Sequence, residues 1–344
     1  MRAAKRRAAT ADRALSRGSA ASRSRRAAAP ELLERVRRGD QGAVSRALTM
    51  VTDEYSGYEA VTRAFFPYHG GSRTIGLCGS PGSGKSSLVN ALVARVRKDA
   101  ETVAVLAVDP SSAYTGGAFL GDRIRVQEHA LDEGVFFRSL ATRGMVGGLN
   151  ETIFAAIHVL QAYEAAKGKR GFDWIFIETV GTGQDEVEIV DVVDTVVCVT
   201  APYQGDEFQA MKAGTMEIAD VFAVNKADLE EVDKAVANIR DAMSLGPDAE
   251  EGAWVVPVHA VSARTKKGVE ELLGSIVDHG RHLEETGKLL ERRKRQLRKE
   301  LSLLISRLIT RSTLDRVTER HIDLLLDKKS DPLTLGRKLI RGGA

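Results

Sequence analysis

Apolar residues along most of the chain recur in short runs, each followed by a segment with helical spacing. The runs are rich in Val and Ile and have the length of single strands, whereas the segments between them are long enough for helices. We expect strands at 73–79, 102–109, 135–140, 172–178, 194–200, 220–225 and 254–258. The alternation predicts an α/β fold in which a doubly wound, mostly parallel sheet is covered by helices on both faces.

Helical spacing without strands marks the two flanks of this pattern. Apolar positions between residues 31 and 65 recur at helical intervals, and Gly39 with Asp40 predicts a break between two helices. From Gly268 to Ser312 the sequence is again helical, and it is highly charged, which predicts a long helix projecting from the sheet. Its apolar stripe consists of Leu289, Leu290, Leu297, Leu301 and Leu304. Such a stripe either packs against its own protein or joins two copies, and we expect a homodimer.

These patterns divide the chain into four parts. We expect a tail at 1–29, a helical extension at 30–70, the sheet domain at 71–280 and a helical C-terminal extension, a candidate dimerisation arm, at 281–344. The tail carries nine Lys or Arg residues and one acid, Asp12. This composition fits a disordered tail or an organelle transit peptide, and we expect the tail. The expected location is therefore the cytoplasm, with the mitochondrial matrix as the alternative.

Composition narrows the class of protein. A chain of 344 residues with 43% hydrophobic residues can bury a substantial core. The net charge of +3 comes from the tail, so we expect no basic face for nucleic acid. No apolar run reaches about 18 residues, which predicts no membrane span and no membrane partner. Cys78 and Cys198 lie in apolar runs and are expected to be buried rather than bonded to each other or to a metal.

The strongest chemical motif connects the first expected strand to the helix after it. The motif is G-x-x-x-x-G-K-[ST], and it reads Gly79-Ser80-Pro81-Gly82-Ser83-Gly84-Lys85-Ser86, followed by Ser87. Glycines allow backbone N–H groups to converge on phosphates, and the helix N-terminus adds positive potential. Lys85 is expected to neutralise β and γ oxygens as a catalytic group, and Ser86 to place its hydroxyl on magnesium. We expect nucleotide binding through this loop, with Ser87 included.

A second motif indicates which base is bound. Asn225-Lys226-Ala227-Asp228 follows the apolar run 221–224 and resembles the NKxD motif of GTPases. The carboxylate of Asp228 can accept from guanine N1–H and from the exocyclic amine, a pattern that adenine cannot satisfy. Ser262-Ala263-Arg264, after the last expected strand, resembles the companion loop that contacts guanine O6. These residues predict GTP rather than ATP.

A third group of motifs is specific to one family. The usual DxxG is replaced by Glu178-Thr179-Val180-Gly181 at the end of an expected strand. The other members of the group are Val108-Asp109-Pro110-Ser111-Ser112, Leu120-Gly121-Asp122-Arg123, Ala141-Thr142-Arg143-Gly144 and Gly183-Gln184-Asp185-Glu186. With these motifs the chain resembles the methylmalonyl-CoA mutase-associated GTPases, the MeaB/ArgK family of SIMIBI-type P-loop NTPases. The resemblance extends from about Glu31 to the C-terminus.

The resemblance implies a site, a switch and a partner. Ser86, Asp109, Asp122 and Glu178 would surround Mg²⁺, a hard cation that takes oxygen ligands. Gln184 is expected to belong first to a switch loop and second to catalysis. Arg143 and Lys212 are further candidates for stabilising the reaction. The family implies regulation of an adenosylcobalamin-dependent acyl-CoA mutase, including cofactor loading and protection, by a GTPase that carries no cobalamin itself.

Two other functions use the same phosphate loop. Metal-delivering GTPases usually carry a His-rich tract or a C-x-x-C motif, and this sequence has neither. His279 and His282, spaced i, i+3 on an expected helix, could share a face and bind a metal. A small-molecule kinase is the other alternative, but an ATP-dependent kinase has no use for a guanine-binding carboxylate.

Overall fold

The computed structural model describes residues 29–109, 129, 131–141, 151–164, 171–179, 187–202, 214–244 and 252–342. The chain forms two compact units, Met1–Arg293 and Lys294–Ala344.

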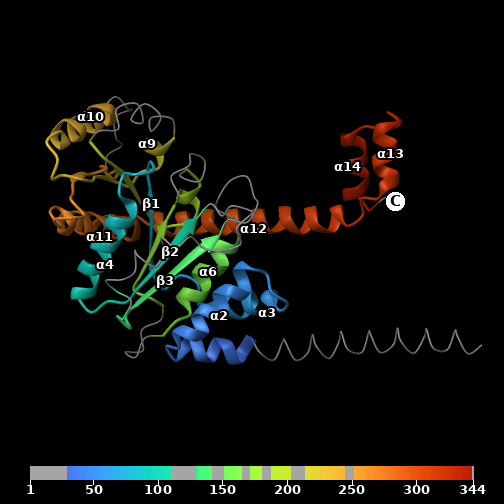
Figure 1. The fold of residues 1–344 in the computed structure, drawn as a ribbon, viewed down its shortest axis with the longest axis horizontal. Coiled ribbons are helices and arrows are strands. Elements are labelled where there is room, and N and C mark those ends of the chain that lie inside the picture. Colours follow the sequence, from blue (N-terminus) through green and yellow to red (C-terminus); the bar gives the residue numbers. More distant parts are fainter. Residues whose placement is uncertain are drawn as a thin grey trace, which may run out of the picture. The chain divides into compact units, whose positions relative to one another are not determined.

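A seven-stranded parallel sheet forms the centre of the first unit (Figure 1). The strand order is β3-β2-β4-β1-β5-β6-β7. The strands are β1 (Arg73–Cys78), β2 (Val103–Asp109), β3 (Val135–Ala141), β4 (Trp174–Glu178), β5 (Thr195–Thr200), β6 (Val221–Val224) and β7 (Val258–Ala260). Every residue of β4, β5 and β6 is buried, as expected for parallel strands covered on both faces. The predicted α/β fold is confirmed.

Helices cover both faces of this sheet (Figure 1). Besides the helical residues 29–37, the described α-helices of the first unit are α2 (Gln41–Thr52), α3 (Tyr58–Phe65), α4 (Lys85–Lys98), α6 (Glu151–Gln161), α9 (Thr215–Ile218), α10 (Val232–Ser244) and α11 (Val269–Glu285), with α12 (Lys288–Leu314) beginning there. On one face α4 packs against α11 and the central strands, and Leu88, Leu92 and Leu272 belong to this core. On the other face α6 packs against α2 and α3.

The last strand begins later than the sequence predicts. The run 254–258 was expected to be a strand, but β7 spans Val258–Ala260. Trp254 instead donates a hydrogen bond from Nε1 to the Asp220 carbonyl at 2.8 Å, and Val255 is 77% exposed. Pro257 has no N–H for a ladder, although its carbonyl accepts from the Phe222 N–H at 2.9 Å. The prediction was wrong because the residues before Pro257 do not join the sheet: Trp254 contacts its edge through one side-chain hydrogen bond, and Val255 faces solvent.

The N-terminal extension contains three described helices instead of the two predicted. Residues 29–37 are helical, and Gly39 adopts φ 80° at the predicted break. Asp40 caps α2 by accepting from the Ala43 N–H at 2.9 Å. A second break between Thr52 and Tyr58 separates α2 from α3. The sequence analysis missed it because apolar spacing continues across this turn.

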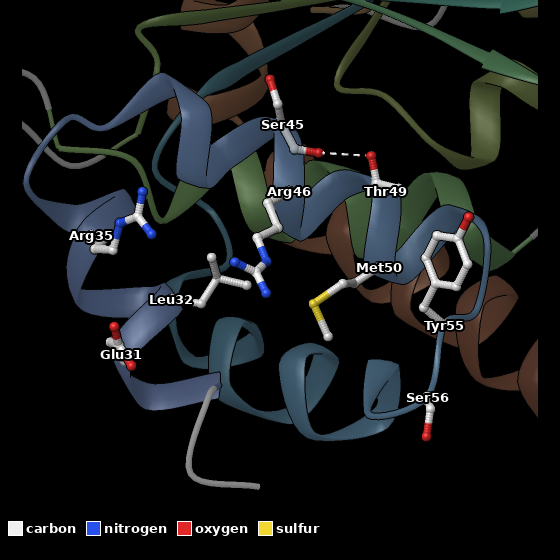
Figure 2. A pocket seen from close by; sticks show the side chains of 9 residues that line it. All are labelled: Glu31, Leu32, Arg35, Ser45, Arg46, Thr49, Met50, Tyr55 and Ser56. Atoms are coloured by element: carbon white, nitrogen blue, oxygen red, sulfur yellow. Dashed lines mark hydrogen bonds between the residues drawn. The ribbon is translucent and has the colours of Figure 1, made fainter. Parts of the chain in front are cut away.

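A pocket of about 620 Å³ opens among these N-terminal helices. Figure 2 shows Arg46 and Met50 of α2 pointing toward Leu32, whereas Glu31 and Ser56 point away from this group. None of the residues that line the pocket belongs to the phosphate loop or to the guanine motif. The pocket is therefore separate from the predicted nucleotide site.

The predicted long C-terminal helix is interrupted. α11 ends at Glu285, Gly287 adopts φ 73°, and α12 follows from Lys288. In the second unit, α12 is followed by α13 (Glu319–Leu326) and α14 (Pro332–Ile340). The predicted stripe on α12 is largely exposed, with Leu301 at 57% and Leu304 at 36%. Among the described residues, no helix has both the length and the apolar character needed to cross a membrane.

A buried ion pair joins the start of α12 to the edge of the sheet where its strands begin. Arg292 donates to both carboxylate oxygens of Asp220, at 2.6 and 2.8 Å. His279 of α11 lies 3.2 Å from the same carboxylate through Nε2, and its Nδ1 is 2.9 Å from Thr195 Oγ1. Burial opposes ionisation of Asp220, but the hydrogen bonds from Arg292 and His279 hold its pKa below the ordinary value. This network anchors α11 and α12 to β5 and β6.

The network generates a prediction about stability. Asp220→Ala should lower the free energy of unfolding by about 3–5 kcal/mol, because it leaves the buried Arg292 charge with the Asp194 carbonyl but without its carboxylate partner. Urea unfolding measures the change. Because the folded pKa of Asp220 is depressed, its contribution is present above about pH 4 and is lost as the pH falls through the folded pKa. The wild type and the variant should therefore converge in acid.

Asp278→Ala is the matched control, because Asp278 pairs with Arg281 at 3.0 Å while both side chains are more than half exposed. It should cost less than about 1 kcal/mol. Equal losses in the two variants would show that the Asp220 network does not anchor the helices.

Candidate nucleotide-binding site

The loop between β1 and α4 has a backbone that requires glycine at two positions. Gly79 adopts φ 128°, and a Cβ there would lie 1.9 Å from the Val199 carbonyl oxygen at the end of β5. Gly84 adopts φ 89° before α4, and its Cβ would lie 2.3 Å from Asn225 Nδ2. Larger residues would push the loop away from its neighbours. The two glycines thus set the loop against the carboxyl ends of the central strands.

Lys85 is the first residue of α4 and its side chain is folded back over this loop. Its Nζ donates to the carbonyls of Gly79 and Ser80, the latter at 3.0 Å, and the residue is 6% exposed. The N-terminus of α4 lies at the same place and adds a partial positive charge. The arrangement concentrates positive potential where phosphates would lie.

Ser86 and Glu178 meet at the carboxyl ends of β1 and β4. The Ser86 hydroxyl donates to a carboxylate oxygen of Glu178, which ends β4 and is 7% exposed. Asp109 ends β2, the strand on the other side of β4. Hydroxyl and carboxylate oxygens suit Mg²⁺. The backbone therefore brings three of the four predicted metal residues to one edge, whereas Asp122 lies outside the described residues.

Asn225 links three loops of the site. It follows β6, is 2% exposed, and donates from Nδ2 to the carbonyls of Ser83 at 2.9 Å and Gly84 at 3.3 Å. Its Oδ1 accepts from the Ala263 N–H at 3.1 Å. The predicted phosphate loop, guanine motif and companion loop are thus held together by one side chain.

Asp228 receives two hydrogen bonds from the companion loop. Ser262 Oγ donates to Oδ1 and Arg264 donates to Oδ2, both at 2.6 Å. The hydrogen bond from Ser262 is the largest cause that holds the pKa of Asp228 below its ordinary value; a backbone hydrogen bond, the charge of Arg264 and its hydrogen bond act in the same direction, although desolvation opposes them. The carboxylate therefore remains an acceptor of hydrogen bonds over the physiological range. Lys226 adopts φ 64° in the turn that leads to Asp228.

The other predicted nucleotide-binding and catalytic residues are partly described by the structure. Pro81, Gly82 and Ser87 are exposed residues of the loop and of the first turn of α4. Gln184, Arg143 and Lys212 lie outside the described residues. Sequence reasoning did not single out Val199, because no local signal shows that β5 lies beside β1.

The histidine pair on α11 has a structural setting. His279 is 2% exposed and contacts Asp220 and Thr195, and its ring lies 5.0 Å from that of Trp254. His282 lies 5.5 Å from the same ring. Among the described residues, no group of three or more His, Cys, Asp or Glu side chains could hold a metal ion. His279 therefore belongs to the core network of the first unit.

Comparisons with known proteins agree with this geometry. The sequence model of one family, described as Methylmalonyl Co-A mutase-associated GTPase MeaB, matches residues 44–318. A relative from Pyrococcus horikoshii named as a GTPase is 42% identical over 305 residues, covering 88% of this chain and 94% of the relative. GTPase ArgK of Escherichia coli is 31% identical over 324 residues, covering 90% of this chain and 95% of that protein.

Two further matches come from an animal protein and a solved structure. A Caenorhabditis elegans protein, named Methylmalonic aciduria type A homolog, mitochondrial, is 34% identical over 230 residues, covering 65% of this chain and 55% of that protein. The crystal structure of a LAO/AO transport system kinase has a TM-score of 0.63 and 25% identity, covering 91% of this chain and 96% of that one. The loop, its lysine and these matches confirm the predicted resemblance: the chain belongs to the methylmalonyl Co-A mutase-associated GTPase MeaB family and is a P-loop GTPase.

Proposed function

We propose that this GTPase regulates an adenosylcobalamin-dependent acyl-CoA mutase of the methylmalonyl-CoA mutase type, by gating the loading of the cofactor and protecting the mutase. The observation that carries the proposal is the family match over residues 44–318, whose description names the mutase. The relative named for methylmalonic aciduria points to the same metabolism. GTP hydrolysis would determine when the cofactor is loaded, and the mutase would hold the cobalamin.

Guanine recognition is assigned to Asp228. Its carboxylate is held ionised and in place by Ser262, which is fully buried. Guanine offers two adjacent donors, N1–H and the exocyclic amine, whereas adenine offers an acceptor at N1. An ionised carboxylate therefore favours guanine and is left unpaired by adenine. Asn225, Lys226, Ala263 and the backbone around them would complete the base pocket.

Phosphate binding is assigned to the loop 79–84, with Lys85, Ser86 and Ser87. The ammonium of Lys85 already lies over the loop, and it would exchange loop carbonyls for phosphate oxygens. Mg²⁺, held by Ser86, Asp109, Asp122 and Glu178, would neutralise charge on the phosphates. Water attacks the γ-phosphorus while the bond to the β–γ bridging oxygen breaks, which gives GDP and phosphate. We assign Gln184 to a switch loop that also positions this water.

Hydrolysis by such a site should be slow without help. Phosphoryl transfer depends on positioned charge, and a site whose water-orienting group is not fixed turns over slowly. A partner that positions the switch loop would accelerate hydrolysis, and the nucleotide state would in turn alter the contact with the partner. This reciprocity would couple GTP hydrolysis to cofactor loading.

We also propose that the protein is a homodimer joined through α12. Leu301, Leu304 and Leu308 are 57%, 36% and 50% exposed, and they lie at helical spacing along one side. An exposed apolar row of this length is typical of an interface. A second copy of the same helix would cover it with matching leucines.

Light scattering of the full chain should give twice the mass of one chain. Leu301→Asp combined with Leu308→Asp should shift the measured mass toward that of a single chain, because each copy would otherwise bury two charges in the interface. The helix content should stay unchanged. Ser302→Asp, at an exposed polar position of the same helix, is the control and should stay dimeric. A single-chain mass for the wild type would refute the dimer.

Replacing Asp228 tests the base assignment. Asp228→Asn should weaken GTP binding about 100-fold or more, because the amide turns a donor toward one of the two guanine donors. Xanthosine triphosphate, which has a carbonyl at that position, should bind the variant better than GTP does. Equilibrium binding of both nucleotides measures the switch. Asp233→Asn, an exposed carboxylate on α10, is the control, and an unchanged preference for GTP in the Asp228 variant would remove the assignment.

Multiple-turnover GTP hydrolysis tests the partner. The purified protein should hydrolyse GTP slowly and ATP hardly at all, and the GTP rate should rise to a plateau as an adenosylcobalamin-dependent mutase from the same source is added. Lys85→Ala with the mutase is the control for contaminating activity and should show no rise. A rate that no such mutase changes would leave the GTPase in place and refute the regulatory role.

A further inference from the structure

Both oxygens of the Asp228 carboxylate accept hydrogen bonds from the protein itself, but the two donors differ in mobility. Ser262 is fully buried, and its Oγ also accepts from the Thr265 N–H at 3.2 Å. Arg264 has a side chain that is 78% exposed. Among the described residues, Arg264 has no hydrogen-bond or ion-pair partner other than Asp228. Ser262 is thus a fixed part of the site, whereas Arg264 is a movable one.

We propose that Arg264 is a gate on the base pocket: its guanidinium pairs with Asp228 Oδ2 and gives up that oxygen when guanine arrives. The proposal rests on the proposed role of Asp228 in reading guanine. The two donors on the edge of guanine require both carboxylate oxygens in the plane of the base. A guanidinium at 2.6 Å from Oδ2 therefore competes with one of these donors for the same oxygen, and the exposed arginine is the partner that can move away.

The backbone around Arg264 limits the motion to its side chain. The Ala263 N–H before it donates to Asn225, and the Thr265 N–H after it donates to Ser262. Ser262 N–H donates to the Lys267 carbonyl at 2.9 Å, which closes the loop on itself. The peptide groups on both sides of Arg264 are therefore fixed. Opening is a rotation of an exposed side chain into water, and no refolding of the loop is needed.

The gate adds to discrimination between bases. Guanine donates its own hydrogen bond to Oδ2 after Arg264 leaves, so the free energy lost with the arginine pair is compensated. Adenine in the same orientation turns its N1 acceptor and C2–H toward the carboxylate, so its entry would break the Asp228–Arg264 pair without a replacement. The pair is exposed on the arginine side, which limits the effect to a severalfold change in rate.

Stopped-flow kinetics with GDP that carries a fluorescent label on the ribose test the gate. Arg264→Ala should raise the association rate constant about two- to fivefold over its control and leave the dissociation rate constant unchanged. Arg264→Gln keeps a hydrogen-bond donor without the charge, so its association rate constant should lie between those of the wild type and Arg264→Ala. The advantage of Arg264→Ala should shrink toward none as salt rises from about 0.05 to 1 M, because salt screens the exposed ion pair.

Lys267→Ala is the matched control. It removes a positive charge from the same loop, and its exposed side chain makes no contact with Asp228, so it reports the loss of electrostatic steering alone. An association rate for Arg264→Ala at or below that of Lys267→Ala would overturn the gate. A severalfold faster dissociation would also overturn it, because Arg264 would then be holding the bound base.

The outcome for Asp228→Asn distinguishes a failure of the gate from a failure of the guanine assignment. If that variant loses GTP affinity while Arg264→Ala leaves association unchanged, the gate is wrong and the guanine assignment stands. If Asp228→Asn retains GTP affinity, the guanine assignment itself is wrong, and the gate is overturned with it.

Discussion

Asn225 fixes the relative positions of the three loops on which the nucleotide site depends. Its amide is buried, and its groups pair with the backbone of Ser83, Gly84 and Ala263. A shift of any one loop would leave a buried polar group unpaired, at a cost of about 1–3 kcal/mol. GTP has a fixed length between its base and its phosphates, so the spacing of these loops decides whether one molecule can contact both. The fold meets this requirement with a single side chain at the end of β6.

Much of the fold could be predicted from the sequence because its signals are local. Parallel strands buried on both faces appear as short apolar runs, and glycines or prolines mark where they stop. The same reasoning failed at 254–257, because an apolar run does not reveal whether it pairs with a strand or only lies beside the edge of the sheet. Gly287 was also missed, since a single glycine within a charged helical sequence is tolerated as often as it breaks the helix.

The site shows the same division between local and distant information. The phosphate loop and the guanine motif could be assigned because each is contiguous and its residue types follow from its chemistry. The approach of the Val199 carbonyl to Gly79 could not be predicted, because it depends on β5 lying beside β1. The same is true of the Asp228–Arg264 pair, in which two motif residues contact each other. Each motif relates its own residue to the ligand and carries no signal that the two residues contact each other.

The charged pairs at the two edges of the sheet differ in exposure. The buried pair lies at the edge that holds helices in place, and the more exposed pair lies at the edge that binds the ligand. Where the strands begin, the side chains of Asp220 and Arg292 are 10% and 15% exposed. Where they end, those of Asp228 and Arg264 are 18% and 78% exposed. A buried pair separates only at a large cost, whereas a pair with one solvated member exchanges readily.

A GTPase must bind and release its ligand in every cycle, so contacts at the edge that binds the ligand have to break at a small cost in free energy. The strand β6 begins next to Asp220 and ends next to Asn225. Its four residues therefore connect the edge with the buried Asp220–Arg292 pair to the edge that binds the ligand. The buried pair resists displacement of β6. A response to the nucleotide is therefore expected in the side chains and loops beyond the strand ends, and the sheet itself should stay in place.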